Sequence, residues 1–367
     1  MHPPGELITQ HGRCPLPAFF PDGTRGVVRA VDAQDLERCG IPGLVVNTFH
    51  LTNTPGIGVI KSQGGIHRFM GWPRPIISDS GGFQAMSMIR ENARYGAISD
   101  AGIMFTNVDT GRKTKLKLTP EKSIQIQFAL GADLMVCLDD CPHPQAGHDQ
   151  VAEAVRRTVR WAKRCKTEFE RQVTNRRLSP SDRPRLFGVI QGGYDRPLRQ
   201  RCAEQLLDIG FDGYGFGGWP LDASGRLAVE TLAHTASLMP DHLFKYALGV
   251  GRPENIVRCA EMGYQIFDCV LPTRDARHQR LYCWDAGPDH SLAYSFLYIQ
   301  DKRYRRDPRP ISENCACPCC THYSRSYLYH LFNIRETSSL RLATMHNLFF
   351  YAELMNRLRA RINRPVQ

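Results

Sequence analysis

The sequence predicts an α/β fold, a (β/α)8 TIM barrel of parallel strands with an inserted or appended C-terminal zinc-binding subdomain. Short apolar segments rich in Val, Ile and Phe alternate with stretches of helical periodicity between about residue 43 and residue 273. A doubly wound sheet would show the same alternation. Several of the apolar segments end in polar residues, which favours a barrel, because barrel active sites gather at the carboxyl ends of the strands. Four cysteines within six residues predict the zinc-binding subdomain.

The predicted elements divide the chain into two parts. We expect the barrel at residues 1–280 and the zinc-binding subdomain, with closing helices at about 322–334 and 337–362, at residues 281–367. The predicted strands are nearly continuous in apolar character, as is typical of parallel strands covered on both faces. They cover 43–48, 75–80, 134–140, 186–191, 213–217, 243–250 and 265–271. The predicted helices follow Thr119 as far as Gly131 and then cover 149–171, 195–209, 224–238 and 253–262.

Composition and charge narrow the class of protein. The chain has 367 residues, of which 42% are hydrophobic and 23% charged, so a disordered or fibrous protein is excluded. No apolar run reaches the roughly 18 residues of a membrane span, and the first residues lack a signal-peptide pattern. We therefore expect a cytoplasmic protein without membrane association. The formal charge of +11 favours a polyanionic partner, and residues 302–309 combine cations with Tyr304.

The cysteine pattern predicts one structural zinc ion per chain. Thirteen cysteines, mostly scattered singly, are unlike a secreted disulfide framework and fit a reducing compartment. Cys315, Cys317 and Cys320 lie on one tight loop, and His346 lies on a predicted helix. Three thiolates and an imidazole form a closed tetrahedral zinc site. Cys319 is a competing third thiol, so the assignment within the loop is left open.

Carboxylates at the predicted strand ends indicate the chemistry. Asp79 precedes a glycine pair, Asp139 and Asp140 end one apolar strand, and Asp268 ends another. A single carboxylate in such a position is as often a helix cap or loop anchor. Three such strands favour a site in which one carboxylate is a nucleophile and another a general acid, as in glycosidic-bond chemistry.

The ordered motifs of the chain are similar to those of one family. They read NTFHL at 47–51, SDSGGFQ at 78–84, LTPEKSI at 118–124, LDD at 138–140, QGG at 191–193, GVG at 249–251, FDCVLPTR at 267–274 and HNL at 346–348, together with the cysteine loop. This pattern, from about Pro17 to Arg361, resembles the tRNA-guanine transglycosylases, also called queuine tRNA-ribosyltransferases.

The resemblance implies an activity and two catalytic residues. Members of the family exchange guanine at the anticodon wobble position of tRNA for a 7-deazaguanine, on a (β/α)8 barrel with a zinc subdomain. By similarity, Asp268 attacks the anomeric carbon of the ribose and forms a covalent intermediate. Asp79 acts as general acid and base. A carboxylate nucleophile divides one displacement into two and restores the original configuration.

The resemblance also implies a set of binding residues and partners. Base binding falls to Asp139, Gln191, Gly218 and Trp219, with Phe83 stacking on the base. Arg274 and Arg277 match positions that contact the RNA. The expected partners are a tRNA with a G-U-N anticodon, a 7-deazaguanine base and a second copy of the chain in a homodimer.

One segment departs from the family pattern. After the glycine at 218, residues 219–223 read WPLDA in place of leucine, a small residue, valine, glycine and glutamate. Because this glutamate is missing, it stays open whether the chain uses the aminomethyl base, and Asp222 is a candidate substitute for the glutamate. Leu221 counts against queuine, which is the larger base. Two other functions remain: a non-catalytic tRNA-binding accessory subunit, against which Asp268 and Asp79 argue, and an enzyme of the same chemistry acting on guanine in DNA.

Overall fold

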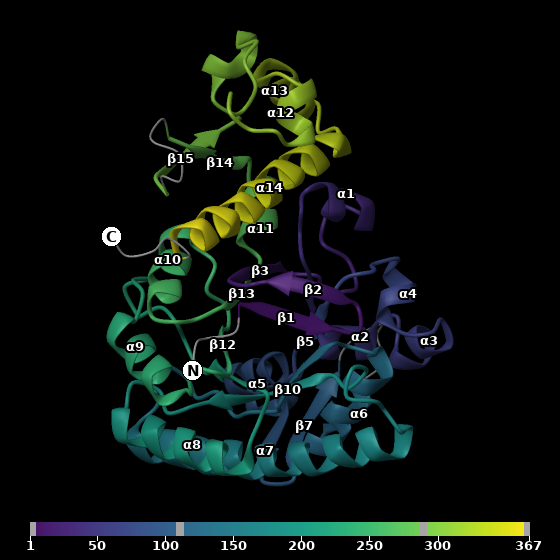
Figure 1. Ribbon diagram of the computed structural model, residues 1–367, viewed down its shortest axis with the longest axis vertical. Helices are drawn as coiled ribbons and strands as arrows, with labels where there is room; N and C mark the ends of the chain where they lie inside the picture. Colours follow the sequence, from purple (N-terminus) through teal and green to yellow (C-terminus); the bar gives the residue numbers. More distant parts are fainter. Residues whose placement is uncertain (1–4, 108–113, 286–291, 363–367) are drawn as a thin grey trace.

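Eight parallel strands form the barrel, which confirms the predicted fold class (Figure 1). The computed structural model describes residues 5–107, 114–285 and 292–362. The strands, in order around the barrel and along the chain, are β3 (Ala18–Pro21), β4 (Leu44–Val46), β5 (Ile76–Ser78), β9 (Leu134–Val136), β10 (Arg185–Ile190), β11 (Gly213–Phe216), β12 (Phe244–Ala247) and β13 (Ile266–Cys269). β13 pairs in parallel with β3, and a parallel bridge between Asp22 and Val45 completes the circle. A doubly wound sheet would have left two open edges.

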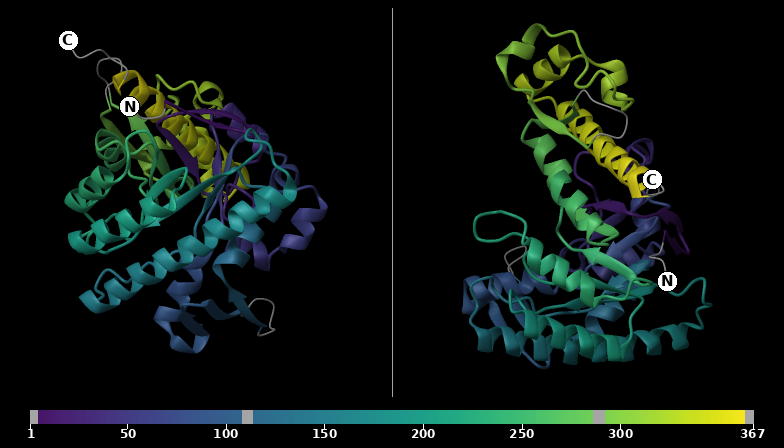
Figure 2. Two further views of the ribbon diagram at one scale, coloured as in Figure 1. Left: turned by 60° about the horizontal axis from the view of Figure 1, so that its bottom comes forward. Right: turned by 60° about the vertical axis from the view of Figure 1, so that its left-hand side comes forward.

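Helices cover the outside of the barrel (Figures 1 and 2). From the N-terminus to the helix that follows β13, these helices are α1 (Ala33–Arg38), α2 (Thr48–Asn53), α3 (Ile57–Ser62), α4 (Ile66–Met70), α5 (Gly82–Glu91), α6 (Pro120–Leu130), α7 (His148–Arg176), α8 (Arg196–Ile209), α9 (Val229–Leu238), α10 (Pro253–Glu261) and α11 (Leu271–Arg277). α6 has the predicted ends, since the Thr119 side chain accepts a hydrogen bond from Lys122 N and Gly131 is left-handed with φ 76°. α9 begins five residues later than the predicted 224, because the Asp222 carboxylate closes a loop by accepting the N–H groups of Ser224 and Arg226.

The first barrel strand and the hairpin before it were not among the predicted elements. β1 (Glu6–Thr9) and β2 (Gly12–Pro15) form an antiparallel pair, and β3 follows between two prolines. Leu7 and Cys14 of the hairpin belong to the same apolar cluster as Phe20, Val136 and Val189 from the barrel strands. The hairpin therefore covers the end of the barrel from which the strands start.

Two histidines clamp this hairpin to the barrel. His11 Nδ1 and His67 Nε2 lie 2.8 and 3.1 Å from the two carboxylate oxygens of Asp133, which also accepts Ile76 N–H at 2.9 Å. The imidazole rings are stacked, with centroids 3.5 Å apart and planes 13° apart. Stacked rings present their nitrogens side by side, one to each oxygen, and each donates an N–H because a carboxylate only accepts. This geometry is that of a hydrogen-bonded clamp.

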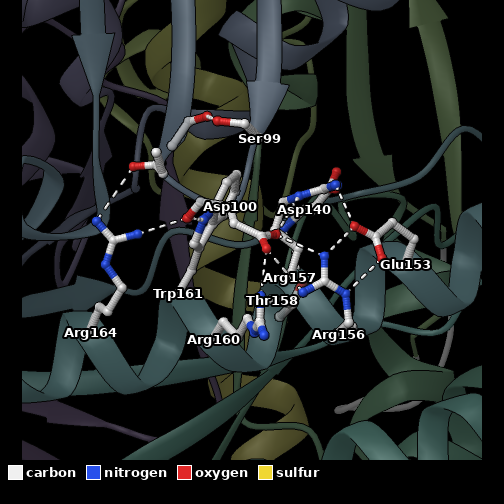
Figure 3. Close-up of polar contacts among 12 residues, drawn as sticks. Ser99, Asp100, Asp140, Glu153, Arg156, Arg157, Thr158, Arg160, Trp161 and Arg164 are labelled. Atoms are coloured by element: carbon white, nitrogen blue, oxygen red, sulfur yellow. Dashed lines mark hydrogen bonds and ion pairs between the residues drawn. The ribbon is translucent and has the colours of Figure 1, made fainter.

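A three-stranded antiparallel sheet is inserted between α5 and α6. It consists of β6 (Gly96–Ser99), β7 (Gly102–Asn107) and β8 (Thr114–Leu118), preceded by the 3-10 turn η1 (Ala93–Tyr95). Figure 3 shows how the β6–β7 turn is fixed to α7: the Asp100 carboxylate accepts from Arg156 and Arg160, and its carbonyl accepts from Trp161 Nε1 at 3.0 Å and Arg164 at 2.8 Å. The arginines of this helix face are thus engaged with the protein itself.

The C-terminal part is joined to the barrel by one long helix. Its elements are β14 (Arg280–Trp284), β15 (Tyr294–Tyr298), the 3-10 turn η3 (Lys302–Arg306), α12 (Pro318–His322), α13 (Arg325–Asn333) and α14 (Thr337–Ile362). α14 runs from α12 and α13 down to the barrel, where it lies against α11 and β3 (Figures 1 and 2). The Arg341 side chain binds the buried Asp35 carboxylate of α1 at 2.6 and 2.7 Å. The division of the chain at residue 280 stays a prediction.

Membrane association has no support in the helices. Within the described ranges, no helix combines the length and the apolar character that crossing a bilayer requires.

Gln127 joins α6 to the two barrel strands that precede Asp79 and Asp139. Its Oε1 accepts Ser78 Oγ at 2.8 Å and Val136 N–H at 3.1 Å, and its Nε2 donates to Val136 O at 3.0 Å. The side chain is fully buried. A methionine of similar volume would remove the Gln127 hydrogen bonds to the buried Val136 N–H and carbonyl, and would leave the Ser78 hydroxyl with the longer bond to a β9 carbonyl at 3.4 Å.

We predict that Gln127→Met lowers the free energy of unfolding by about 2–3 kcal/mol, measured by urea denaturation. Gln125→Met is the matched control on the same helix, because Gln125 is half-buried and hydrogen bonds only to Glu168 among the described residues. The control is expected to change stability by less than about 0.5 kcal/mol. Equal losses in the two variants would contradict a specific role for Gln127.

Candidate active site at the carboxyl ends of the strands

Asp79 lies directly after β5 in a cage of hydrogen-bond donors. Its carboxylate accepts Thr48 N–H at 2.9 Å, Gly81 N–H at 3.1 Å and the Asn47 side-chain amide. Burial raises the pKa of Asp79 to about 7, although these hydrogen bonds oppose the rise. The donors hold the carboxyl group in one orientation through both of its oxygens.

Asp268, on β13, lies near Asp79 although 189 residues separate them in the sequence. It accepts Tyr246 Oη–H at 2.8 Å and Gly249 N–H at 2.9 Å. Burial raises the pKa of Asp268 to about 6, and the negative charge of Asp268 contributes to the raised pKa of Asp79. The structure therefore brings together the two carboxylates that the sequence assigned to catalysis.

Asp139 and Gln191 form a second polar pair. Gln191 Nε2 donates to Asp139 Oδ2 at 2.6 Å, and burial raises the pKa of Asp139 to about 6. Gln191 is fully buried, and its Oε1 has no hydrogen-bond partner in the described part of the chain. The pair thus places a half-buried carboxylate acceptor at the strand end, held from within by the Gln191 amide.

Asp140 has a different environment from its neighbour Asp139. Its carboxylate binds the guanidinium group of Arg90 from α5. It also binds that of Arg157 from α7, and its backbone N–H donates to Thr158 Oγ1 at 3.0 Å (Figure 3). Only 2% of Asp140 is exposed. Asp140 therefore fixes the strand end between two helices, and Asp139 is the residue left for a ligand.

Two aromatic rings stand above these groups. Phe83, at the start of α5, and Trp219, after β11, are 43% and 41% exposed. Their ring centroids are 5.7 Å apart with planes at 60°. The preceding backbone is close to Gln191: a Cβ on Gly217 would lie 2.6 Å from Gln191 Nε2, and Gly218 has φ 106°. Large side chains at 217 and 218 would obstruct this subsite.

Asp222 does not face these groups freely. Its carboxylate accepts Ser224 Oγ–H at 2.6 Å and two backbone N–H groups, and Arg226 lies 3.5 Å away. These contacts lower the pKa of Asp222, with the Ser224 hydrogen bond as the largest cause. Asp222 therefore closes the loop that follows Trp219, which accounts for an acidic residue at this point without a ligand.

The two predicted RNA-contacting arginines lie on α11, one turn from each other. Arg274 is exposed, whereas Arg277 is half-buried next to Asp22 and Arg29. Burial lowers the pKa of Arg277, and its Nη1 has no hydrogen-bond partner among the described residues. Because Asp22 is close to both Arg277 and Asp268, Arg277 is near the candidate active site.

The four predicted zinc ligands converge. The Sγ atoms of Cys315, Cys317 and Cys320 lie 3.8, 3.4 and 3.4 Å from His346 Nδ1, and all four ligand atoms lie within 4.8 Å of one another. His346 Nε2 donates to Tyr282 O at 2.7 Å, which leaves Nδ1 as the metal ligand. Three sulfurs and one nitrogen fit a tetrahedral zinc ion. Cys319 is buried but is not part of this group in the described chain.

Several residues that shape the site were not identified as functional from the sequence. Asn47 and Thr48 appeared only as part of a motif, and Tyr246 and Arg199 were not considered. Tyr246 lies inside β12, where Ala247 follows it, so its position in the strand does not mark it as functional. A buried arginine on a helix, such as Arg199, has no signal in a single sequence, because its partners are carbonyl groups of distant turns.

Comparison with known proteins finds similarity over nearly the whole chain. A family model described as queuine tRNA-ribosyltransferase matches residues 4–365. A queuine tRNA-ribosyltransferase of Methylacidiphilum infernorum is 39% identical over 97% of this chain and 90% of its own length. Proteins of that name from Halothermothrix orenii and Lysinibacillus sphaericus are 39% and 38% identical, each over 98% of this chain and over 89% and 88% of their own lengths.

We predict that Cys317→Ser abolishes zinc binding, because a closed site of four ligands depends on each thiolate. Cys319→Ser is the matched control and is expected to retain about one zinc ion per chain. Elemental analysis of the purified variants gives the metal content. Loss of zinc in Cys319→Ser with retention in Cys317→Ser would reverse the assignment.

Proposed function

The chain belongs to the queuine tRNA-ribosyltransferase family, whose members are tRNA-guanine transglycosylases, and on that basis we propose that it exchanges guanine at the anticodon wobble position of tRNA for a 7-deazaguanine base. The observation that supports this proposal most is the pair of half-buried carboxylates at one end of the barrel, where loss of hydration raises the pKa of Asp79 to about 7 and that of Asp268 to about 6. Between these values, Asp79 retains a proton while Asp268 is ionised.

The first half of the reaction uses both carboxylates. An ionised Asp268 oxygen attacks C1′ of the target ribose and forms an aspartyl–ribosyl ester as the bond from C1′ to N9 of guanine breaks. Asp79 gives its proton to the departing guanine. Tyr246 and Gly249 both donate to Oδ1 of Asp268, so they hold the carboxylate by the oxygen that does not attack C1′. Proton donation and a positioned nucleophile are the usual means of cleaving a glycosidic bond.

The second half reverses these roles. The incoming 7-deazaguanine gives its N9 proton to the Asp79 carboxylate and attacks C1′, and the Asp268 ester bond breaks. Two displacements restore the original configuration, and the protons balance over the cycle. Thr48, Gly81 and Asn47 stabilise the Asp79 anion that exists between the halves.

Base recognition is proposed for the subsite around Asp139. The carboxylate accepts N–H groups of the guanine-like edge, Gln191 and the Gly218 N–H contact the other polar atoms, and Phe83 with Trp219 covers the ring. Burial of a donor and acceptor set makes such a site selective, because a base with the wrong edge leaves buried groups without a partner. The engagement of Asp222 in its own loop counts against Asp222 as a contact for a 7-aminomethyl group.

The remaining parts of the proposal concern partners. Arg274 and Arg277 contact RNA phosphates near the target nucleotide of a G-U-N anticodon loop, a structural zinc ion holds the C-terminal part, and two copies form a homodimer in the cytoplasm. Retention of both Asp79 and Asp268 in one connected site favours a catalytic chain over an accessory subunit. A measurement of guanine exchange on duplex DNA beside tRNA tests the second alternative, an enzyme of the same chemistry that acts on guanine in DNA.

We predict that Asp268→Asn abolishes both guanine exchange and the covalent RNA–protein species. The amide lacks the negative charge that the attack requires. Incubation of the zinc-loaded protein with G-U-N tRNA, followed by a denaturing gel, detects the adduct. Asp208→Asn, an exposed aspartate of α8, is the matched control and is expected to react normally. Persistence of the adduct in Asp268→Asn would assign the nucleophile to another residue.

The pKa values predict a bell-shaped pH dependence of kcat/KM with its maximum between about 6 and about 7. Activity rises as Asp268 loses its proton and falls as Asp79 loses the proton it must donate. Asn47→Ala removes a donor that stabilises the Asp79 anion, so the pKa of Asp79 rises and the alkaline limb moves to higher pH. An unmoved alkaline limb in a folded Asn47→Ala protein would assign that limb to another group.

A further inference from the structure

Arg199 is a buried cation directly beneath the base subsite. It lies on α8 and is 1% exposed. Its guanidinium donates to three backbone carbonyls: Nε to Gly193 O at 2.7 Å, Nη1 to Ile190 O at 3.0 Å and Nη2 to Gly217 O at 2.9 Å. Ile190 is the last residue of β10, and the two glycines lie in the turns after β10 and β11 that carry Gln191 and Gly218.

No carboxylate neutralises this charge among the described residues. Its neighbours are the carbonyl groups, the Phe216 ring with its centroid 4.4 Å from the guanidinium carbon, and the side chains of tyrosines and cysteines. Burial accordingly lowers the pKa of Arg199 to about 10. A charged group is costly to bury without a counter-ion, so the stability of the fold does not by itself explain an arginine that is held only by carbonyl groups.

The hydrogen bond to Gly217 fixes the direction of the next peptide. In a trans peptide, the N–H of residue 218 points away from the carbonyl of residue 217. Since that carbonyl faces Arg199, the Gly218 N–H points to the opposite side from the guanidinium. The glycine at 218, with φ 106°, has no side chain to impose this orientation by packing. A rotated peptide would present a carbonyl oxygen in place of the N–H.

The same guanidinium also fixes Gln191. Ile190 O accepts both Arg199 Nη1 and Gly217 N–H at 2.9 Å, so the ends of β10 and β11 are joined through one carbonyl. The Gln191 amide packs against Gly217, and a Cβ there would lie 2.7 Å from Gln191 Cδ. A displacement of the 217–218 peptide is therefore transmitted to Gln191.

We propose that Arg199 is a positioning residue for base selection: it aims the Gly218 N–H and supports the Gln191 amide, so that the subsite accepts a purine-like base with a carbonyl oxygen on that edge. This inference rests on the proposed function and deepens it. Arginine suits the task because its rigid fork binds three carbonyls at once, whereas a lysine ammonium cannot span them in a fixed geometry.

The test compares guanine with 6-thioguanine, which keeps both N–H donors of the edge and replaces the oxygen with a weak acceptor. Steady-state exchange gives kcat and KM for each base, and calorimetry gives their binding to the free protein. The variants are Arg199→Met, which removes the charge and the fork, and Arg199→Lys, which keeps the charge. Arg201→Met, an exposed arginine of the same helix, is the matched control. Zinc content and the Kd for tRNA report whether each variant is folded.

In Arg199→Met we expect the KM for guanine to rise about tenfold and the preference for guanine over 6-thioguanine to fall about fivefold, with the Kd for tRNA unchanged. Arg199→Lys is expected to recover part of that preference, and Arg201→Met to match the wild type. A folded Arg199→Met protein with unchanged preference would overturn the inference. So would an equal loss of tRNA and guanine binding, which indicates a structural role only.

Two further outcomes are decisive. If Arg199→Met does not fold, the Arg199→Lys variant decides the test. An Arg199→Lys protein that is less stable but keeps the wild-type preference for guanine over 6-thioguanine overturns the inference. If the wild-type protein exchanges no guanine, the proposed function fails, and calorimetry still tests Arg199 through the preference between the two free bases. If the wild type exchanges guanine and the variants keep its preference between the two bases, the proposed function holds and Arg199 has no role in base selection.

Discussion

Desolvation of carboxylates at the barrel mouth is the constraint on which the rest of the site depends. Asp79, Asp139 and Asp268 are half-buried, and loss of hydration is the largest cause of the raised pKa of each. In water all three would be ionised at neutral pH and none could donate a proton. The barrel makes the desolvation possible, because its closure brings the ends of β5 and β13 together from opposite ends of the chain.

Hydrogen-bond donors in fixed positions stabilise these desolvated carboxylates. Each carboxylate receives hydrogen bonds from groups that belong to the fold: Gly81 and Thr48 for Asp79, Tyr246 and Gly249 for Asp268, and Gln191 for Asp139. Arg199 of α8 in turn holds the backbone on both sides of Gln191. Polar groups that are placed before the reaction need not reorganise during it, which is how such a site stabilises developing charge.

The sequence allowed the fold class to be predicted, because it leaves a local pattern, and the candidate reactive residues came from the family resemblance. The alternation of apolar segments and helices indicated the barrel, and acidic residues after apolar segments indicated its active end. The predicted strand at 134–140 shows the limit: β9 ends at Val136, the Cys137 N–H makes the last hydrogen bond to β10, and residues 138–140 form the turn that carries Asp139. The hairpin before β3 and the late start of α9 were missed because the end of the barrel and the Asp222 loop specify them through tertiary contacts. Arg199 and Tyr246 were missed for the same reason, since a single sequence does not show which carbonyl or carboxylate a buried polar side chain meets.

The most direct test of the account is mass spectrometry of the product tRNA after incubation of the zinc-loaded protein with a G-U-N tRNA and a panel of 7-deazaguanine bases, each supplied alone. The account predicts that guanine is lost from the wobble position alone and that one base of the panel replaces it. No replacement by any base, from a protein with intact zinc that binds the tRNA, would contradict it.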